Sequence, residues 1–565
     1  MKIIGRYFIL LQGLLFIAYY SCSQPLSQKG KFTRQDTLRG TITPEREWWD
    51  VASYDIFVEP DFSSRSIKGW NEIAFDINSD GSHRKMQIDL QQPMEIDSII
   101  FNGKRITDFK RNGNVYLVDF GSFKFTAART LVKKEKALPL HKIRIYFHGK
   151  PVVAKNPPWD GGWIFSKDAK DNPWMTVACQ GLGASVWYPC KDHQSDEPDL
   201  GATIQIKIPN GLTAVSNGQI GKSIVQGEKT IWTWQVKNPI NNYNIVPYIG
   251  KYVSFGEKYQ GEAGTLNIEY WVLDYNKDKA QKQFARDVIP MLKCFEYWFG
   301  PYPFYEDGFK LVESSHLGME HQSAIAYGNH YMNGYLGMDL SGSGWGNSWD
   351  YIIVHESGHE WFGNNITTKD IADMWVHEGF TMYSEVLFVE CQFGKKAADE
   401  YCQGIRKSID NDRPVIGYYG VNQEGSGDMY NKGANLIHTI RQVVNDDSLF
   451  RKILRGLNKD FWHKTVTSKE VEDYISKHAG KDFSKVFDQY LRTTRIPVLE
   501  YKIQGDKISY RWGNCIAGFN MPVQLEKSGQ WLKPTSEWQS VTGTAELLQN
   551  FSVNKNYYIN VEAAR

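Results

Sequence analysis

The segment "VHESGHEWFGN" places two histidines four residues apart, with a glutamate directly after the first. Residues four apart lie on one face of a helix, so His355 and His359 can offer two imidazole nitrogens to one ion. Two ligands do not hold zinc, because a catalytic zinc site takes three protein ligands and keeps a fourth position open. Glu356 can reach a water in that position without binding the metal, so it is the expected general base.

The third ligand is expected nineteen residues past the second histidine, at Glu378 in "WVHEGFTMYSE". The polar stretch "NNITTKDIAD" between the two helical patterns gives the chain room to reverse. Two nitrogens and one carboxylate suit Zn²⁺, which would make a bound water acidic enough for attack near neutral pH. Glu385 lies on the same helical face as Glu378 and is expected to orient a ligand histidine, although a solvated carboxylate is the alternative. His377 points about 100° away around the helix and is not expected to be a ligand.

The elements that must position these residues form three blocks. Residues 46–255 alternate apolar and polar positions in short segments such as "YDIFVEP" and "ATIQIKIP", which predicts an antiparallel all-β domain. Residues 256–495 are dominated by helical periodicity, as in "AQKQFARDVIPMLKCFEYWFG", and hold the proposed ligands. Residues 496–565 return to strand patterns and predict a small β-sandwich. The predicted fold class is therefore multidomain α+β.

Composition narrows the class of partner. At 565 residues the chain is too long for a single core. Its 65 basic and 64 acidic residues nearly cancel, so bulk charge gives no argument for a nucleic acid or an anionic membrane as partner.

The amino terminus "MKIIGRYFILLQGLLFIAYYSCSQ" has basic residues followed by an apolar run that is shorter than the ~20 residues a spanning helix needs. Residues 1–22 are therefore expected to be a secretory signal peptide, followed by a polar linker over 23–45. The final Ser-Cys resembles a bacterial lipoprotein cleavage site, in which Cys22 would carry lipid. Tyr19 and Tyr20 fit that site poorly, so simple secretion is the alternative. The protein is expected to be exported, as a periplasmic protein, an outer-membrane lipoprotein or a secreted protein.

Six further cysteines are scattered along the chain. Disulfides are allowed in an exported protein, but the spacing assigns no pair. The sequence has no C-x-x-C motif, so a cysteine zinc site is not expected, and most of these residues are expected to be buried thiols.

Two motifs together carry a family resemblance. "HESGHEWFGNNIT" followed by "DMWVHEGF" resembles the zinc aminopeptidases related to aminopeptidase N and leukotriene hydrolase, the gluzincins. The resemblance runs from about residue 50 to 500 and includes "FGPYPF", "QGLGASVWYPCKD", "DEPD" and "YLRTTRIP". It implies a thermolysin-like catalytic domain over 256–495, one Zn²⁺ per chain, and removal of N-terminal residues from peptides.

The resemblance also implies how substrate is held. "LGMEH" occupies the place of the family's Gly-x-Met-Glu-Asn strand, whose glutamate binds the free amine, so Glu320 is expected to take that role. Leu317 and His321 depart from the family pattern and leave substrate preference and pH profile open. The first substrate pocket is expected to be lined by three further residues: Gln180, Gly318 and Met319.

The segment "GDMYNKGANLI" resembles the family's Tyr-x-Lys-Gly helix start, which places a phenol near the metal. Tyr430 is therefore expected to stabilise the oxyanion that forms when the peptide carbonyl is attacked.

The chain resembles the bacterial three-domain form, which lacks the large C-terminal helical domain of many family members. We therefore expect an open cleft that accepts longer peptides, unless a partner in a homodimer covers it.

Three other functions stay open. A non-catalytic peptide-binding module is disfavoured because all ligands and the base are present. Epoxide hydrolysis alongside peptide cleavage needs an apolar tunnel usually completed by the missing domain. A thermolysin-like endopeptidase would not need Glu320. Membrane contact is expected only through lipid on Cys22.

Overall fold

A computed structural model describes residues 32–78, 82–123, 125, 141–543, 548–549 and 551–564. The predicted signal peptide, with Cys22, lies outside these residues, as does the first part of the predicted linker. No helix in the described ranges is both long and apolar enough to cross a membrane.

The described part of the predicted linker contains one short helix and the start of a second. Helix α1 (Arg34–Gly40) begins at a capping box formed by Thr33 and Asp36, and α2 (Pro44–Glu47) follows. Long-range contacts hold the segment in place: the Thr41 hydroxyl donates to the Gly420 carbonyl at 2.6 Å. Polar composition alone suggested a linker, but local capping and these distant partners order it.

The N-terminal block is built of β-sheets that enclose one apolar core. Strand β11 alternates buried and partly exposed residues, as its sequence pattern predicted. One pairing departs from the predicted antiparallel arrangement, because β1 and β11 are parallel, with the long intervening chain making the crossover. The largest sheet contains β1 (Trp49–Asp61), β2 (Ser66–Ile77), β4 (Glu95–Phe101), β5 (Lys104–Ile106), β8 (His141–Gly149), β11 (Ala202–Pro209), β13 (Gln219–Ile220), β14 (Ile224–Gln226) and β15 (Lys229–Val236).

Two smaller sheets complete this block. A three-stranded sheet contains β3 (Lys85–Asp89), β6 (Phe109–Asn112) and β7 (Val115–Asp119). A four-stranded sheet contains β9 (Gly162–Lys167), β10 (Pro173–Ala178), β12 (Thr213–Val215) and β16 (Tyr248–Gly250).

The central block combines a five-stranded sheet with helices, and the sheet begins earlier than the sequence boundary at 255/256. Its first strand starts at Tyr252 because it pairs along its length with β18. The strands are β17 (Tyr252–Gly261), β18 (Gly264–Leu273), β19 (Phe309–Glu313), β20 (Gly318–Met319) and β21 (Ile325–Tyr327). The helices are α3 (Lys277–Phe299), α4 (Tyr351–Gly358), α5 (Trp375–Phe393), α6 (Lys395–Ile405), α7 (Asn431–Val444), α8 (Asp447–Asp460), α9 (Ser468–Ala479) and α10 (Ser484–Leu491).

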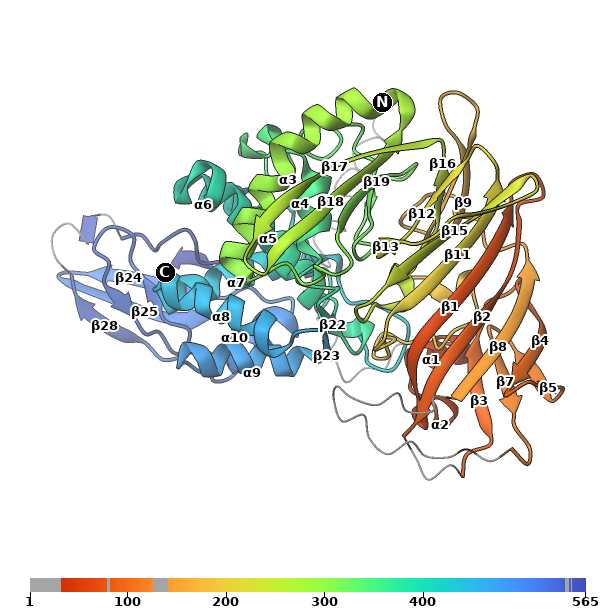
Figure 1. Ribbon diagram of the computed structural model, residues 1–565. Helices are drawn as coiled ribbons and strands as arrows, with labels where there is room; N and C mark the ends of the chain where they lie inside the picture. The colour runs from red at the N-terminus through yellow and green to blue at the C-terminus, as the bar shows by residue number, and fades with distance from the viewer. Residues whose placement is uncertain are drawn as a thin grey trace, which may run out of the picture.

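A small pair of parallel strands, β22 (Ile366–Thr368) and β23 (Lys464–Val466), ties the α4–α5 connection to the later helices. The C-terminal module has one four-stranded and one two-stranded sheet, and its buried side chains join the same apolar core as the catalytic helices. Figure 1 shows this module and the N-terminal β-sheets on opposite sides of the helices. Its strands are β24 (Val498–Gln504), β25 (Lys507–Gly513), β26 (Val523–Gln524), β27 (Trp531–Leu532), β28 (Gln539–Thr542) and β29 (Asn560–Ala563).

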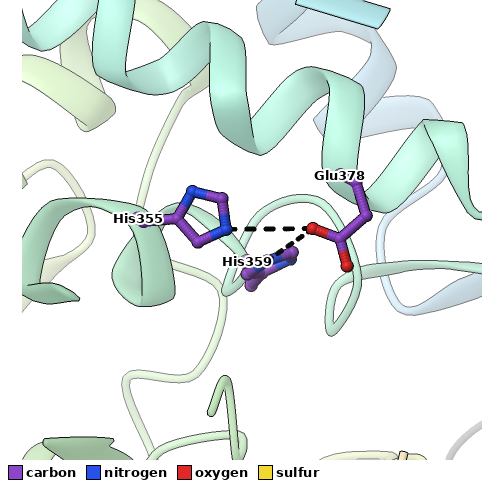
Figure 2. A group of neighbouring side chains, drawn as sticks. All are labelled: His355, His359 and Glu378. Atoms are coloured by element: carbon purple, nitrogen blue, oxygen red, sulfur yellow. Dashed lines mark ion pairs between the residues drawn. The ribbon is translucent and has the colours of Figure 1, made fainter. Parts of the chain in front are cut away.

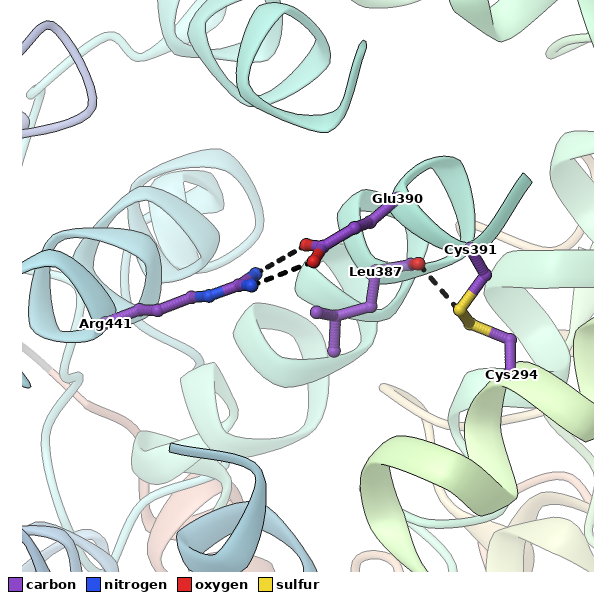
Figure 3. The surroundings of a disulfide bond; sticks show 5 residues. All are labelled: Cys294, Leu387, Glu390, Cys391 and Arg441. Atoms are coloured by element: carbon purple, nitrogen blue, oxygen red, sulfur yellow. Dashed lines mark hydrogen bonds and ion pairs between the residues drawn. A yellow bond between two sulfur atoms is a disulfide. The ribbon is translucent and has the colours of Figure 1, made fainter. Parts of the chain in front are cut away.

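A disulfide joins α3 to α5 through Cys294 and Cys391 (Figure 3). Beside it, the Arg441 guanidinium of α7 donates to both oxygens of Glu390 on α5, at 2.6 and 2.9 Å. The disulfide closes a loop over a sequence separation of 97 residues that includes both histidines and Glu378. The other described cysteines are free thiols, three buried and one half-buried, as expected for most of them.

Candidate metal centre and active site

Helix α4 presents the two histidines on one side. Its N-cap, Asp350, accepts hydrogen bonds from two backbone amides of the first turn. The helix ends at Gly358, one residue before the second histidine, but His359 keeps right-handed helical dihedrals of φ −63° and ψ −21°. A Cβ added to Gly358 would lie 2.4 Å from the Ser384 hydroxyl of α5, so this glycine lets α4 press directly against α5.

The three predicted ligands converge (Figure 2). The Oε2 atom of Glu378, in the first turn of α5, lies 3.8 Å from His355 Nε2 and 3.3 Å from His359 Nε2. All three side chains are buried. The polar connection between the helices thus reverses the chain as the sequence suggested.

Each histidine is held through its other nitrogen. The Nδ1 of His355 donates to the Glu385 carboxylate at 2.6 Å, and the Tyr401 hydroxyl donates to the second oxygen of that carboxylate, also at 2.6 Å. The Nδ1 of His359 donates to the Phe362 carbonyl at 3.0 Å. In the neutral imidazoles that bind a metal, the lone pair is therefore on Nε2, the nitrogen nearest to Glu378. Glu385 is fully buried, so the solvated-carboxylate alternative does not describe it.

These residues fit a zinc ion. Ligand atoms 2.0–2.1 Å from a tetrahedral zinc lie about 3.4 Å from one another, close to the two nitrogen–oxygen distances here. Glu378 Oε2 is buried, makes no hydrogen bond of normal geometry with the described residues, and faces the two histidine nitrogens, as a metal-binding oxygen would. Burial disfavours the protonated form of His359, but the nearby Glu378, Glu320 and Glu356 together outweigh burial and raise the pKa of His359 to about 10. The site thus attracts positive charge, and two imidazoles with a carboxylate are donors that zinc accepts.

Glu356 lies beside the ligands and lines the same cavity. Burial raises the pKa of its carboxyl to about 7; His355 opposes the shift and Glu320 adds to it. A Cβ added to Gly318 would lie 2.5 Å from Glu356 Oε1, so a larger residue in strand β20 would push this carboxylate from its place. That contact gives a physical reason for the glycine in the "LGMEH" segment.

Glu320 is fixed by two donors. Its Oε1 accepts from the Gln180 amide at 2.6 Å and from the Tyr243 hydroxyl at 2.8 Å. The neighbouring His321 is fully buried, with its Nδ1 hydrogen-bonded to the Tyr248 hydroxyl at 2.5 Å. Burial holds the pKa of His321 well below its ordinary value, so this departure from the family pattern adds a neutral ring beside the carboxylate.

Tyr430 precedes α7, and its ring stacks against that of His355 with centroids 6.1 Å apart. A close helix contact allows this position, because a Cβ added to Gly433 of α7 would lie 2.8 Å from the Cα of Gly379 in α5. Burial and the nearby Glu378 raise the pKa of the Tyr430 phenol well above its ordinary value. The hydroxyl therefore stays protonated and can donate a hydrogen bond.

One cavity of about 310 Å³ joins these groups. Every residue predicted for metal binding, catalysis or substrate binding lines it, and only Glu385 stands behind it. His377 is elsewhere: its Nε2 accepts from the Thr368 amide at 2.8 Å. Sequence reasoning missed several residues of the site, which come from segments without a motif: Trp159, Tyr243, Tyr335, Tyr351 and Glu424.

Known proteins resemble this chain in sequence and fold. Residues 287–490 match the Peptidase family M1 domain. The chain is 22% identical to probable aminopeptidase 2 of Sulfurisphaera tokodaii over 85% of its own length and 59% of that protein. It is 24% identical to the alanine/arginine aminopeptidase of Saccharomyces cerevisiae, over 84% of this chain and 54% of that one. It therefore spans somewhat more than half the length of these relatives.

A solved structure shares the fold. It is a mutant of the M1 zinc metallopeptidase of Deinococcus radiodurans bound to a Tyr-Ser-Ala substrate, with a TM-score of 0.66 at 18% identity. The match covers 81% of this chain and 98% of that one, and at this identity it shows the fold alone. Residues 287–490, which contain the three converging ligands, Glu320, Glu356 and Tyr430, are thus a peptidase family M1 domain.

Proposed function

We propose that this protein is a zinc-dependent aminopeptidase, which hydrolyses the first peptide bond of peptides with a free amino terminus. One observation carries the proposal: the buried, doubly hydrogen-bonded Glu320 lines the same cavity as Glu356 and the ligand trio. A carboxylate in that place can bind an α-amine while the first carbonyl lies next to the metal site. The aminopeptidases among the relatives support the same activity.

The mechanism follows from the residues of the chain. Zn²⁺ bound to His355, His359 and Glu378 would act as a Lewis acid that activates water and polarises the carbonyl. Glu356 takes the proton of the attacking water; its pKa of about 7 suits a group that later gives that proton to the leaving amine. Tyr430 donates its hydroxyl proton in a hydrogen bond to the developing oxyanion.

The other functions receive less support. A non-catalytic peptide-binding module would not require a base and an ordered ligand set in one cavity. Epoxide hydrolysis needs a long apolar tunnel, whereas this cavity of about 310 Å³ is lined by four glutamates.

A matched pair of peptides tests the proposal. The metal-loaded protein is incubated with a peptide and with its N-acetylated form, and mass spectrometry follows the products. We expect stepwise loss of N-terminal residues from the free peptide only, and loss of that activity in Glu356→Gln, which keeps the side-chain shape. Cleavage of both peptides at similar rates would instead indicate an endopeptidase. Absence of any cleavage would contradict the proposal.

We also propose that the protein is exported and that Cys22 carries lipid. The apolar segment before Cys22 and the disulfide between α3 and α5 both suit an oxidising compartment. Membrane fractionation of cells that express wild type or Cys22→Ala tests the anchor: only the wild type should sediment with membranes. The cleft is a separate proposal: it is open to longer peptides unless a homodimer covers it, and sedimentation velocity would detect that homodimer as twice the chain mass.

A further inference from the structure

The cavity contains one carboxylate that has no assigned role in the proposed reaction. Four glutamates line it, and no lysine or arginine does so among the described residues. Glu378 belongs to the metal site, Glu356 to proton transfer and Glu320 to the α-amine. Glu424 remains. It lies in the connection between α6 and α7, six residues before Tyr430.

The loop that carries Glu424 is fixed on both sides. The Asn422 amide donates to the Asp36 carbonyl of α1 at 3.1 Å. The Arg413 guanidinium donates to the Gly425 carbonyl at 2.8 Å. A Cβ added to Gly425 would lie 1.8 Å from the Val415 carbonyl oxygen, so the backbone there is tightly packed. The carboxylate is therefore presented to the cavity from a fixed backbone, as a recognition group needs to be.

The charge of Glu424 is left without a partner. Its side chain makes no hydrogen bond or ion pair with the described residues, and it is only partly exposed. The Arg413 guanidinium is engaged by the Gly425 carbonyl and by Asp412 at 3.7 Å. Burial, then Glu378 and Glu320, raise the pKa of Glu424 to about 7. A cation that enters the cavity would relieve this unfavourable charge.

The metal would neutralise Glu378, the α-amine would neutralise Glu320, and Glu356 exchanges a proton. A further cation for Glu424 must therefore come from the substrate. The N-terminal side chain is the part of the substrate nearest to Glu320 and the metal site. Met319 and the rings of Trp159 and Tyr335 also line the cavity and can pack against the aliphatic stem of a basic side chain.

We propose that Glu424 binds the cationic side chain of the N-terminal residue, so that the preferred substrates are peptides that begin with arginine or lysine. This inference rests on the proposed aminopeptidase function and names its substrate class. It makes Glu424 a specificity residue, distinct from Glu320, which would bind the α-amine of every substrate.

The test compares substrates that differ in charge but hardly in shape. Arginyl and citrullinyl reporters are hydrolysed by the zinc-loaded wild type, by Glu424→Gln and by Glu526→Gln, which removes an exposed carboxylate in the C-terminal module. We expect the wild type to favour arginyl over citrullinyl in kcat/KM by about 10- to 100-fold, the range for a hydrogen bond to a charged group. Glu424→Gln should abolish that preference and leave citrullinyl hydrolysis within about twofold, and Glu526→Gln should change neither. Unchanged melting temperatures establish that the variants are folded.

Two results would overturn the inference: equal rates for the two reporters in the wild type, or an equal loss on both in Glu424→Gln, which would place Glu424 on the α-amine or in the fold. Calorimetric binding of free arginine and citrulline separates this inference from the proposed function. If no reporter is hydrolysed, the proposed function fails. In that case, tighter calorimetric binding of arginine than of citrulline to the wild type, lost in Glu424→Gln, would still support the role of Glu424. Equal binding of arginine and citrulline to the wild type would refute that role.

Discussion

Glu385→Gln is the substitution that most clearly separates the metal site from the rest of the cavity. The side chain lies behind His355 and does not line the cavity, so its loss leaves the substrate groups in place. Glutamine has the same shape and can still accept from His355 Nδ1, but it removes the charge that polarises the imidazole. It also replaces one carboxylate oxygen by an amide that can no longer accept from Tyr401.

The magnitude follows from two short contacts. His355 Nδ1 and the Tyr401 hydroxyl each lie 2.6 Å from Glu385, and all three side chains are buried. Burial opposes a charged His355, yet Glu385 raises the pKa of that ring above its ordinary value, so the carboxylate increases the basicity of the ligand. Loss of such a partner typically costs 10- to 100-fold in metal affinity, or about 1.4–2.8 kcal/mol.

Competition with a chelator of known zinc affinity measures this loss directly, without activity as the readout. Tyr401→Phe is the matched control, because it removes one donor and keeps the carboxylate, and it should cost clearly less. If Glu385→Gln binds zinc within about twofold of the wild type, the argued role of this carboxylate is wrong.

Three further predictions concern catalysis and stability. Gly318→Ala should push Glu356 from its place and lower kcat by about 100-fold with zinc content unchanged, as measured by steady-state kinetics and metal analysis; unchanged kcat would contradict the tight contact. Burial raises the pKa of Glu197 from 4.5 to about 8. Between these two pH values the folded protein keeps a proton on this carboxyl that the unfolded chain has lost. Stability should therefore fall as pH rises toward 8, by up to ~1.4 kcal/mol per pH unit, and Glu197→Gln should flatten the decline in urea titrations; identical slopes would refute this. Replacing Cys294 and Cys391 by alanine should cost about 2–5 kcal/mol in the free energy of unfolding, because the unfolded chain gains a long open loop; a loss below about 1 kcal/mol would contradict that estimate.

Spacing predicted the metal site in two halves. His355 and His359 share a helix face, and Glu385 lies two turns beyond Glu378 on the face of another helix. The polar stretch between the two helical patterns suggested that these faces meet. Glu320 and Tyr430 needed the family resemblance, because nothing in their spacing relates them to the histidines.

Residues fixed by distant contacts could not be predicted. Tyr243 reaches Glu320 from the N-terminal block, and the loop of Glu424 is held, through Asn422, by a helix of the segment predicted to be a linker. The parallel pairing of β1 with β11 was also missed. The alternation of apolar and polar residues along a strand shows which face is buried, but it does not show the direction of the neighbouring strand.

Metal stoichiometry tests the central claim most directly. Elemental analysis of the purified protein, reconstituted with zinc and freed of excess ion, should give one zinc per chain in the wild type. Glu378→Ala should give almost none while its far-ultraviolet circular dichroism stays that of the folded protein. A folded wild type without stoichiometric zinc, or a Glu378→Ala variant that retains it fully, would contradict the account.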